Sequence, residues 1–254
     1  MWKRIRITIL LLILATIALE TWRAQRAATS WRDTLQVAVY PVSGDGSPAA
    51  AQRIATLERD SFAEIEQFLA DEVKRYGVAT LQPVRLNLQP PLNTAPPSPP
   101  QRAGVLDSVL WSLKLRWWAW RLPTPAIRPN VRLFVIYHDG KTGKVPASHG
   151  LQRGHIAIAH VFADRAMQQA NAVVIAHELL HTLGATDKYD PASLEPVYPQ
   201  GYAQPHASPR LPQHFCELMA GRLPSVSGPP EQPRSLSQCL IGEQTASEIG
   251  LLRR

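Results

Sequence analysis

The sequence lacks several features that would place it in a class at once. It has no run of five or six basic residues outside the N-terminal region, although its formal net charge is +7, and no nucleic-acid-binding motif is visible. We therefore expect no nucleic-acid partner and interpret the charge as a solvated basic surface. No internal repeat is present, so 254 residues suit one large domain or two lobes that share a cleft.

Long apolar runs are also missing, with one exception near the N-terminus. Basic residues precede an apolar run over 7–19, which is the order found in signal and anchor segments. Because no small-residue cleavage site follows, we expect residues 1–30 to be a membrane anchor, with residues 5–22 in the bilayer, or else a signal segment. The basic residues stay in the cytoplasm, so the pattern predicts a single-pass membrane protein whose remaining residues are extracytoplasmic, periplasmic in a Gram-negative cell. Secretion after signal cleavage is the alternative.

Strands and helices alternate along the next part of the chain. The helix over 105–122 carries four tryptophans beside basic residues, and we expect it to pack on a sheet rather than on a membrane surface, because apolar residues surround it. Helical periodicity also predicts a long helix over 49–76, between two strands of a βαβ-like unit. The expected strands cover residues 35–42, 83–88, 131–137 and 154–162.

One segment carries a pattern typical of metal chemistry. Apolar residues at helical spacing surround His177, Glu178 and His181, and no proline interrupts the run before Gly184. Two histidines four residues apart present their imidazoles from one face of a helix, one turn apart, which suits two ligands of one zinc ion. Glu178 lies on the neighbouring edge, where it can hydrogen-bond a water and act as a general base.

A third ligand is expected from the chain that follows this helix. Gly184 permits a sharp exit, because glycine adopts the left-handed conformation without a Cβ clash. The first acidic residue that this turn delivers is Asp187. The sequence thus predicts a Zn²⁺ site held by His177, His181 and Asp187, with water in the fourth position.

The segment His177–Asp187 resembles the metzincin signature, with Asp187 in place of the last histidine, as in snapalysin-type zinc proteases. The resemblance implies an α+β fold with a mixed twisted sheet, an antiparallel edge strand over the cleft, an active-site helix and a small loop-rich C-terminal lobe. It implies an upper catalytic lobe over 31–187 and a lower lobe over 188–254. It also implies an extended peptide or protein substrate that binds along the strand 154–162.

The lower lobe contains a segment that resembles a Met-turn. Met219 follows the zinc motif and lies among small residues, so the resemblance implies that it forms a hydrophobic floor beneath the metal. An oxidising compartment would let Cys216 and Cys239 form a disulfide that ties this turn to a final helix over 242–252. Two buried free thiols are the alternative.

Several residues compete for roles in the site. The sequence does not choose among Tyr189, Tyr198 and Tyr202 as donors to an oxyanion. The residues that could replace Asp187 as third ligand are Asp190, Glu195, His206, His214 and Glu217.

These patterns together predict a zinc-dependent endopeptidase. Glu178 would take a proton from the attacking water and pass it to the leaving amine. Two alternatives remain, a non-catalytic zinc-binding envelope protein and a zinc hydrolase that acts on a cell-wall amide bond. The sequence predicts no oligomeric state.

Overall fold

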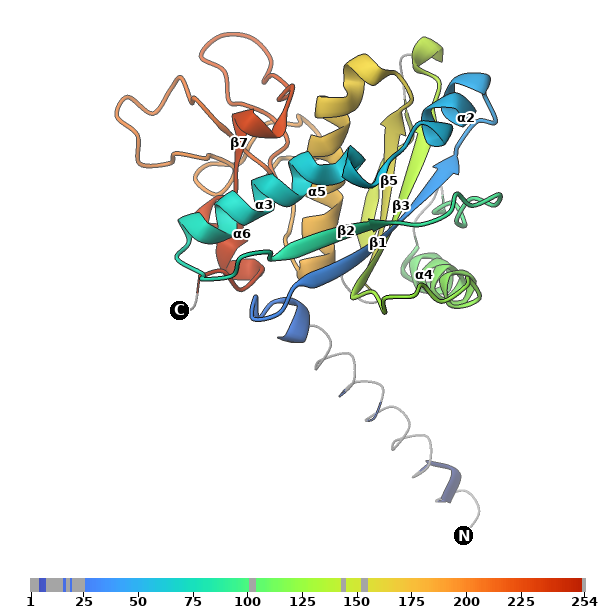
Figure 1. The fold of residues 1–254 in the computed structure, drawn as a ribbon. Helices are drawn as coiled ribbons and strands as arrows, with labels where there is room; N and C mark the ends of the chain where they lie inside the picture. The colour runs from blue at the N-terminus through green and yellow to red at the C-terminus, as the bar shows by residue number, and fades with distance from the viewer. Residues whose placement is uncertain are drawn as a thin grey trace.

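A computed structural model describes residues 5–7, 16, 19, 26–100, 104–142, 145–151 and 155–252. These residues form an α+β fold around a mixed five-stranded sheet with helices on both faces (Figure 1). The strand order is β2-β1-β3-β5-β4, and all neighbours are parallel except β4 and β5. The strands are β1 (Leu35–Ser43), β2 (Val84–Leu88), β3 (Val131–His138), β4 (His149–Leu151) and β5 (Ile156–Phe162). The larger helices are α3 (Ala63–Arg75), α4 (Val105–Trp120) and α5 (Gln168–Leu183).

Two hydrophobic cores lie on opposite faces of the sheet. Alternate residues of β3 show the division, since Leu133 and Val135 pack in one core and Phe134 and Ile136 in the other. The first core contains residues of α3 and α5, and the second contains residues of α4. Strands that are buried on both faces are apolar at nearly every position, which explains the nearly continuous apolar run that predicted a strand over 131–137.

The expected helix over 49–76 is divided into three pieces. α2 (Pro48–Ala55) is followed by the 3-10 turn η1 (Arg59–Phe62) and then by α3. The Thr56 hydroxyl donates to the Arg53 carbonyl at 2.9 Å, so a side chain competes with the helical backbone where α2 ends. The division turns α2 toward the carboxyl ends of the strands, where it lies in Figure 1.

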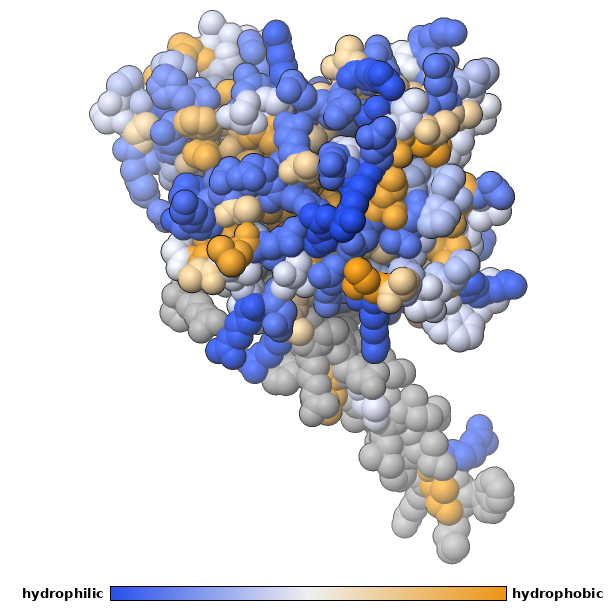
Figure 2. Space-filling model, viewed as in Figure 1, coloured by the Kyte–Doolittle hydropathy of each residue, from blue (hydrophilic) through white to orange (hydrophobic). Residues whose placement is uncertain are grey.

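The helix α4 packs on the sheet, as its sequence predicted. Leu115 and Ala119 are buried in the second core. The opposite side of α4 faces outward and carries large apolar side chains that are each more than half exposed: Leu106, Val109, Leu110, Leu113, Trp117 and Trp120. Elsewhere, the face seen in Figure 2 is mainly hydrophilic, with scattered hydrophobic residues.

The prediction for the strand over 154–162 was wrong in its place and direction. This segment forms β5, which is parallel to β3 and lies inside the sheet; residue 154 is outside the described residues. The antiparallel edge strand is β4, which pairs with Ile156–Ile158 of β5. A substrate strand can therefore not add to this part of β5, because β3 and β4 already occupy its two edges.

The prediction of a single-pass membrane protein is also corrected. Over the residues that the structure describes, none of the helices has both the length and the apolar character needed to cross a membrane. This finding contradicts the expected anchor over 5–22. Most of that segment lies outside the described residues.

The chain beyond α5 contains few regular elements. β6 (Cys216–Glu217) and β7 (Cys239–Leu240) form a parallel pair, and α6 (Glu243–Glu248) is shorter than the helix expected over 242–252. Buried residues of this region, such as Met219 and Ile241, belong to the same core as α3 and α5.

The predicted disulfide between Cys216 and Cys239 is absent. The two residues face each other in the β6–β7 register, but both are free and buried thiols. The Cys216 Sγ donates to the Glu217 carbonyl at 3.1 Å, and the Cys239 Sγ lies 3.6 Å from the Ser235 carbonyl. Backbone pairing and burial hold the two strands together, so a covalent link is not required.

Candidate metal centre

The helix α5 carries the metal motif on a buried scaffold. Residues such as Ala176, Leu179 and Leu183 are at most 1% exposed, so burial of this apolar surface holds the helix against the sheet. The helix ends at Gly184, whose φ of 112° lies in the left-handed region that glycine favours. This exit turns the chain back toward the two histidines.

His177, His181 and Asp187 converge at one point. The Nε2 atoms of His177 and His181 are 3.0 Å apart. The Asp187 Oδ1 lies 3.1 Å from the His177 Nε2 and 3.2 Å from the His181 Nε2. In a tetrahedral zinc site with ligand bonds of about 2.05 Å, neighbouring ligand atoms lie about 3.3 Å apart. The three side chains therefore have nearly the spacing that one zinc ion requires.

The orientation of both imidazoles is held from behind. The Nδ1 of His177 lies 3.0 Å from the Leu218 carbonyl, and the Nδ1 of His181 lies 2.8 Å from the Ala185 carbonyl. Because carbonyl oxygens only accept, each Nδ1 carries a proton; in the neutral imidazole, which is the form that binds a metal, each Nε2 then turns an unshared electron pair toward the other ligands. Two such nitrogens and a carboxylate at this distance repel one another unless a cation or proton lies between them.

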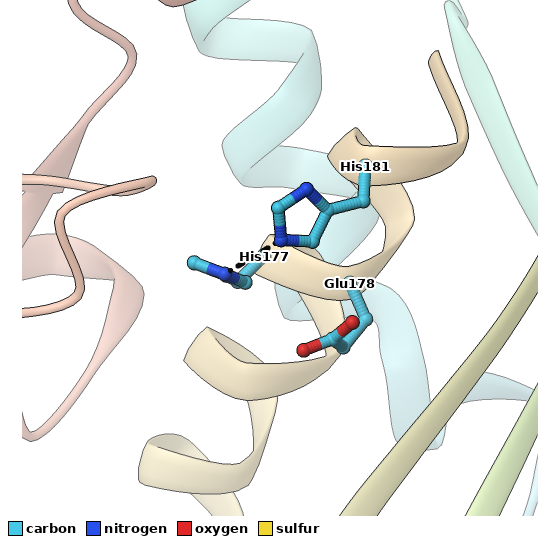
Figure 3. Close-up of side chains that lie close together, drawn as sticks. All are labelled: His177, Glu178 and His181. Atoms are coloured by element: carbon cyan, nitrogen blue, oxygen red, sulfur yellow. Dashed lines mark hydrogen bonds between the residues drawn. The ribbon is translucent and has the colours of Figure 1, made fainter. Parts of the chain in front are cut away.

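Glu178 completes a group that could hold a metal ion. One ligand atom from each of His177, Glu178 and His181 lies within 4.8 Å of the others, and Figure 3 shows the three side chains on two neighbouring turns of α5. Asp187 is nevertheless the better third ligand, because its oxygen is closer to both imidazole nitrogens. Glu178 is thereby left for another role.

The Glu178 carboxyl is buried and incompletely bonded. Its side chain is 5% exposed, and its Oε2 has no hydrogen-bond partner among the described residues. Burial raises the pKa of Glu178, the nearby His177 and His181 lower it, and Asp187 raises it further. A buried acceptor without a partner is costly, so this oxygen is suited to a water or substrate that enters the site.

The ligand residues also shift one another's protonation. Burial alone would lower the pKa of His177, but the hydrogen bond to Asp187 and the nearby charge of Glu178 raise it. Burial alone would raise the pKa of Asp187, but the hydrogen bonds to His177 and His181 hold it well below its usual range. Asp187 is therefore an anion at neutral pH, as a metal ligand must be.

Glu248 and Lys188 clamp the loop that carries Asp187. The Glu248 carboxylate accepts hydrogen bonds from the Thr186 backbone N–H at 2.9 Å and the Thr186 hydroxyl at 3.0 Å. The Lys188 Nζ, on a residue that is 5% exposed, donates to Glu248 at 2.8 Å and to the Thr186 carbonyl at 2.7 Å. Both chain neighbours of Asp187 are thus tied to α6.

The segment around Met219 supports the same loop. Met219 is fully buried, and its carbonyl accepts a hydrogen bond from the Lys188 N–H at 3.0 Å. The preceding carbonyl, of Leu218, is the partner of the His177 ring. This turn therefore positions two parts of the metal centre through its backbone.

The competing ligands lie elsewhere. The Asp190 carboxylate accepts from the Ala192 and Ser193 N–H groups in its own turn. The buried Glu217 carboxylate is occupied by the Thr245 hydroxyl at 2.7 Å and by the backbone N–H groups of Ala220 and Gly242. The side chains of Glu195, His206 and His214 are exposed.

Of the three tyrosines, Tyr189 is the one beside the metal centre. It lines a cavity of about 410 Å³ together with His177 and Glu178. Burial raises the pKa of Tyr189, and the charges of Asp187 and Glu178 raise it further. Tyr198 and Tyr202 stack edge to face, with ring centroids 5.2 Å apart, and are absent from the lining of this cavity.

Gly150 is a residue of the site that the sequence did not reveal. A Cβ atom at this position would lie 2.3 Å from the Cβ of His181 and 2.7 Å from the Glu178 carbonyl. Glycine therefore allows the backbone of β4 to lie directly against the helix α5. A lone glycine in an irregular segment carries no pattern that would indicate this contact.

Comparison with known proteins identifies no relative of this chain. No protein-family description matches the chain, and no curated protein is similar to it.

Proposed function

We propose that the protein is a zinc-dependent endopeptidase of metzincin-like type. The observation that carries this proposal is the convergence of His177, His181 and Asp187 within 3.2 Å, beside a buried Glu178 carboxyl whose Oε2 has no partner in the described part of the chain. A metal-binding site that only stabilised the fold would be expected to have four protein ligands. Three protein ligands leave one position open, which is typical of catalytic zinc.

Zn²⁺, when bound by these ligands, would lower the pKa of a water and polarise a substrate carbonyl. Glu178 accepts a proton from the attacking water and then donates it to the leaving amine. The raised pKa of Glu178 suits it for both steps, because it makes the carboxylate a stronger base and brings both protonation states closer to being available at neutral pH. Tyr189 lines the same cavity and can donate a hydrogen bond to the oxyanion.

The cleft beside the metal centre has a volume of about 410 Å³, which lies in the range of ligand pockets. Apolar residues form much of its wall, including Phe162, Val173 and Leu194. The antiparallel edge strand β4 lies against α5 through Gly150, so an extended peptide that pairs with the outer edge of β4 would pass the metal centre. Peptide binding along β4 replaces the earlier prediction for 154–162.

Replacement of Glu178 by glutamine tests the proposal. The amide keeps the shape but accepts no proton, so zinc should remain bound while peptide cleavage falls by about 10²- to 10⁴-fold. The measurement is zinc content by elemental analysis, together with cleavage of a peptide library by the full chain. Asp187→Ala is the companion variant and should lose zinc itself.

Each outcome separates one function from another. Cleavage by Glu178→Gln at the wild-type rate would show that the mechanism is wrong. One bound zinc with no turnover of peptides or cell-wall fragments by the wild type would indicate a non-catalytic metal protein. Turnover of cell-wall fragments alone would assign the same residues to a different amide substrate.

A further inference from the structure

A second and larger cavity lies at the carboxyl ends of the parallel strands. It has a volume of about 960 Å³ and is lined by α2, by the residues that follow β3 and by those that follow β5. In open sheets, ligands bind outside the carboxyl ends of strands where neighbouring strands connect in opposite directions. From β1 the chain connects to β2 on one side of the sheet, whereas from β3 it connects to β4 and β5 on the other side. The cavity therefore lies where the direction of connection reverses.

Arg53 lies at this cavity without an acidic partner. It is 9% exposed, and no carboxylate of the described residues lies within 4.0 Å of it. Its Nη2 donates to the Gln168 side chain at 3.1 Å, but its buried Nε has no partner among the described residues. A buried guanidinium that lacks a counter-charge is costly, and an anionic ligand would relieve that cost.

The other charges of the cavity leave it positive. Asp164 caps the turn that follows it by accepting from the Ala166 N–H at 2.9 Å, and Asp139 accepts from the Lys141 N–H and lies 3.8 Å from its ammonium. Arg165 is exposed at the same cavity and forms no ion pair within the described part of the chain. Two guanidinium groups are thus available to an anion.

This cavity adjoins the one beside the metal centre. Phe162 and Met167 line both. Gln168, the partner of Arg53, begins α5, and His177 follows it by nine positions, about 14 Å along the helix axis. An extended peptide advances about 3.4 Å per residue, so roughly four residues span this distance.

We propose that the Arg53 cavity binds an anionic group of the peptide substrate, about four residues from the bond that is cleaved. The ligand is the carboxylate of an aspartate or glutamate side chain, or the terminal carboxylate of a short peptide. Arg53 acts as a specificity-determining residue, and Arg165 supports it at the rim. This inference rests on the proposed endopeptidase activity.

Cleavage of a positional peptide series by the full chain tests the inference. One glutamate is moved through a neutral peptide on both sides of the cleaved bond, and kcat/KM is measured against the same peptide with glutamine. Glutamate about four positions away, on one side only, should raise kcat/KM about 10- to 100-fold, as for hydrogen bonds to a charged group. A terminal carboxylate at that position should have the same effect relative to the amide.

Arg53→Gln should reduce the ratio of glutamate to glutamine cleavage to nearly one. Arg59→Gln is the matched control, because Arg59 is exposed, lies on η1 and lines neither cavity, and it should keep the ratio. If Arg53→Gln does not fold, the exposed variant Arg165→Glu carries the test and should lower the ratio by itself.

The possible results distinguish failure of this inference from failure of the proposed endopeptidase activity. Cleavage by the wild type without any positional preference for glutamate overturns this inference and leaves the endopeptidase intact. A preference that persists in both Arg53→Gln and Arg165→Glu also overturns it. If the wild type cleaves none of the peptides, the proposed function fails and this inference fails with it.

Discussion

Replacement of Glu248 by alanine is expected to weaken zinc binding at the proposed site, although Glu248 forms no hydrogen bond or ion pair with His177, His181 or Asp187. Its carboxylate holds Thr186 and Lys188, the two chain neighbours of Asp187. Without it, the ligand loop must be ordered when the metal binds, and the cost of that ordering subtracts from the binding free energy. Outer partners of metal ligands typically contribute about 10- to 100-fold in affinity.

The size of the effect can be worked out as a stability shift. At a zinc concentration 100 times the wild-type Kd, binding should stabilise the folded protein by about 2.7 kcal/mol. If the Kd of Glu248→Ala is 10 to 100 times higher, the same zinc concentration should stabilise it by only about 1.4 to 0.4 kcal/mol. The buried Lys188 also loses its counter-charge, so the metal-free variant should be less stable than the metal-free wild type.

Competition with a chromophoric zinc chelator gives the Kd, and urea unfolding with and without zinc gives the stabilisation. Glu243→Ala is the control, because Glu243 is exposed on the same helix, and its Kd should match that of the wild type. A Kd for Glu248→Ala within about twofold of the wild-type value would refute the reasoning. So would an equal loss of affinity in Glu243→Ala.

Two further predictions concern the cleft. Gly150→Ala should lower the free energy of unfolding by about 1 to 3 kcal/mol, because a Cβ atom would overlap the His181 Cβ and the Glu178 carbonyl. An unchanged midpoint of urea unfolding would contradict this prediction. Burial and the nearby His138 and His149 lower the pKa of His160 from 6.5 to about 4. The unfolded state therefore binds more protons than the folded state between pH 4 and 6.5, so the free energy of unfolding should fall as the pH drops through this range. His160→Gln should reduce this pH dependence, whereas His206→Gln, at an exposed position, should keep it. Equal pH dependence of the two variants in urea unfolding would contradict the prediction.

Local patterns predicted much of the scaffold. Helical periodicity indicated α5, and the four-residue spacing placed His177 and His181 on one face of it, where the structure brings their Nε2 atoms to 3.0 Å. The left-handed exit at Gly184 was expected from the same segment, and Asp187 lies where that turn delivers it. These features depend on residues that are near one another in the chain.

The features that the sequence did not predict depend on long-range contacts. β4 has three residues, one of them Gly150, so no alternation marks it as the edge strand. Glu248 is 62 residues from Thr186, and no spacing rule links an acidic residue of a short helix to a distant loop. The division of the first long helix is a local exception: the Thr56 hydroxyl bonds the Arg53 carbonyl where α2 ends, whereas apolar periodicity continues through this point.

The contact between Trp31 and Ile249 sets the boundaries of any fragment prepared for these experiments. The Trp31 indole N–H donates to the Ile249 carbonyl at 2.8 Å, and Trp31 is 2% exposed. Glu248 precedes Ile249, so trimming either terminus into this contact would loosen the helix that clamps the ligand loop. Expression fragments should therefore begin before Ala28 and retain Leu251, both of which are buried, and affinity tags should be separated from these ends by flexible spacers.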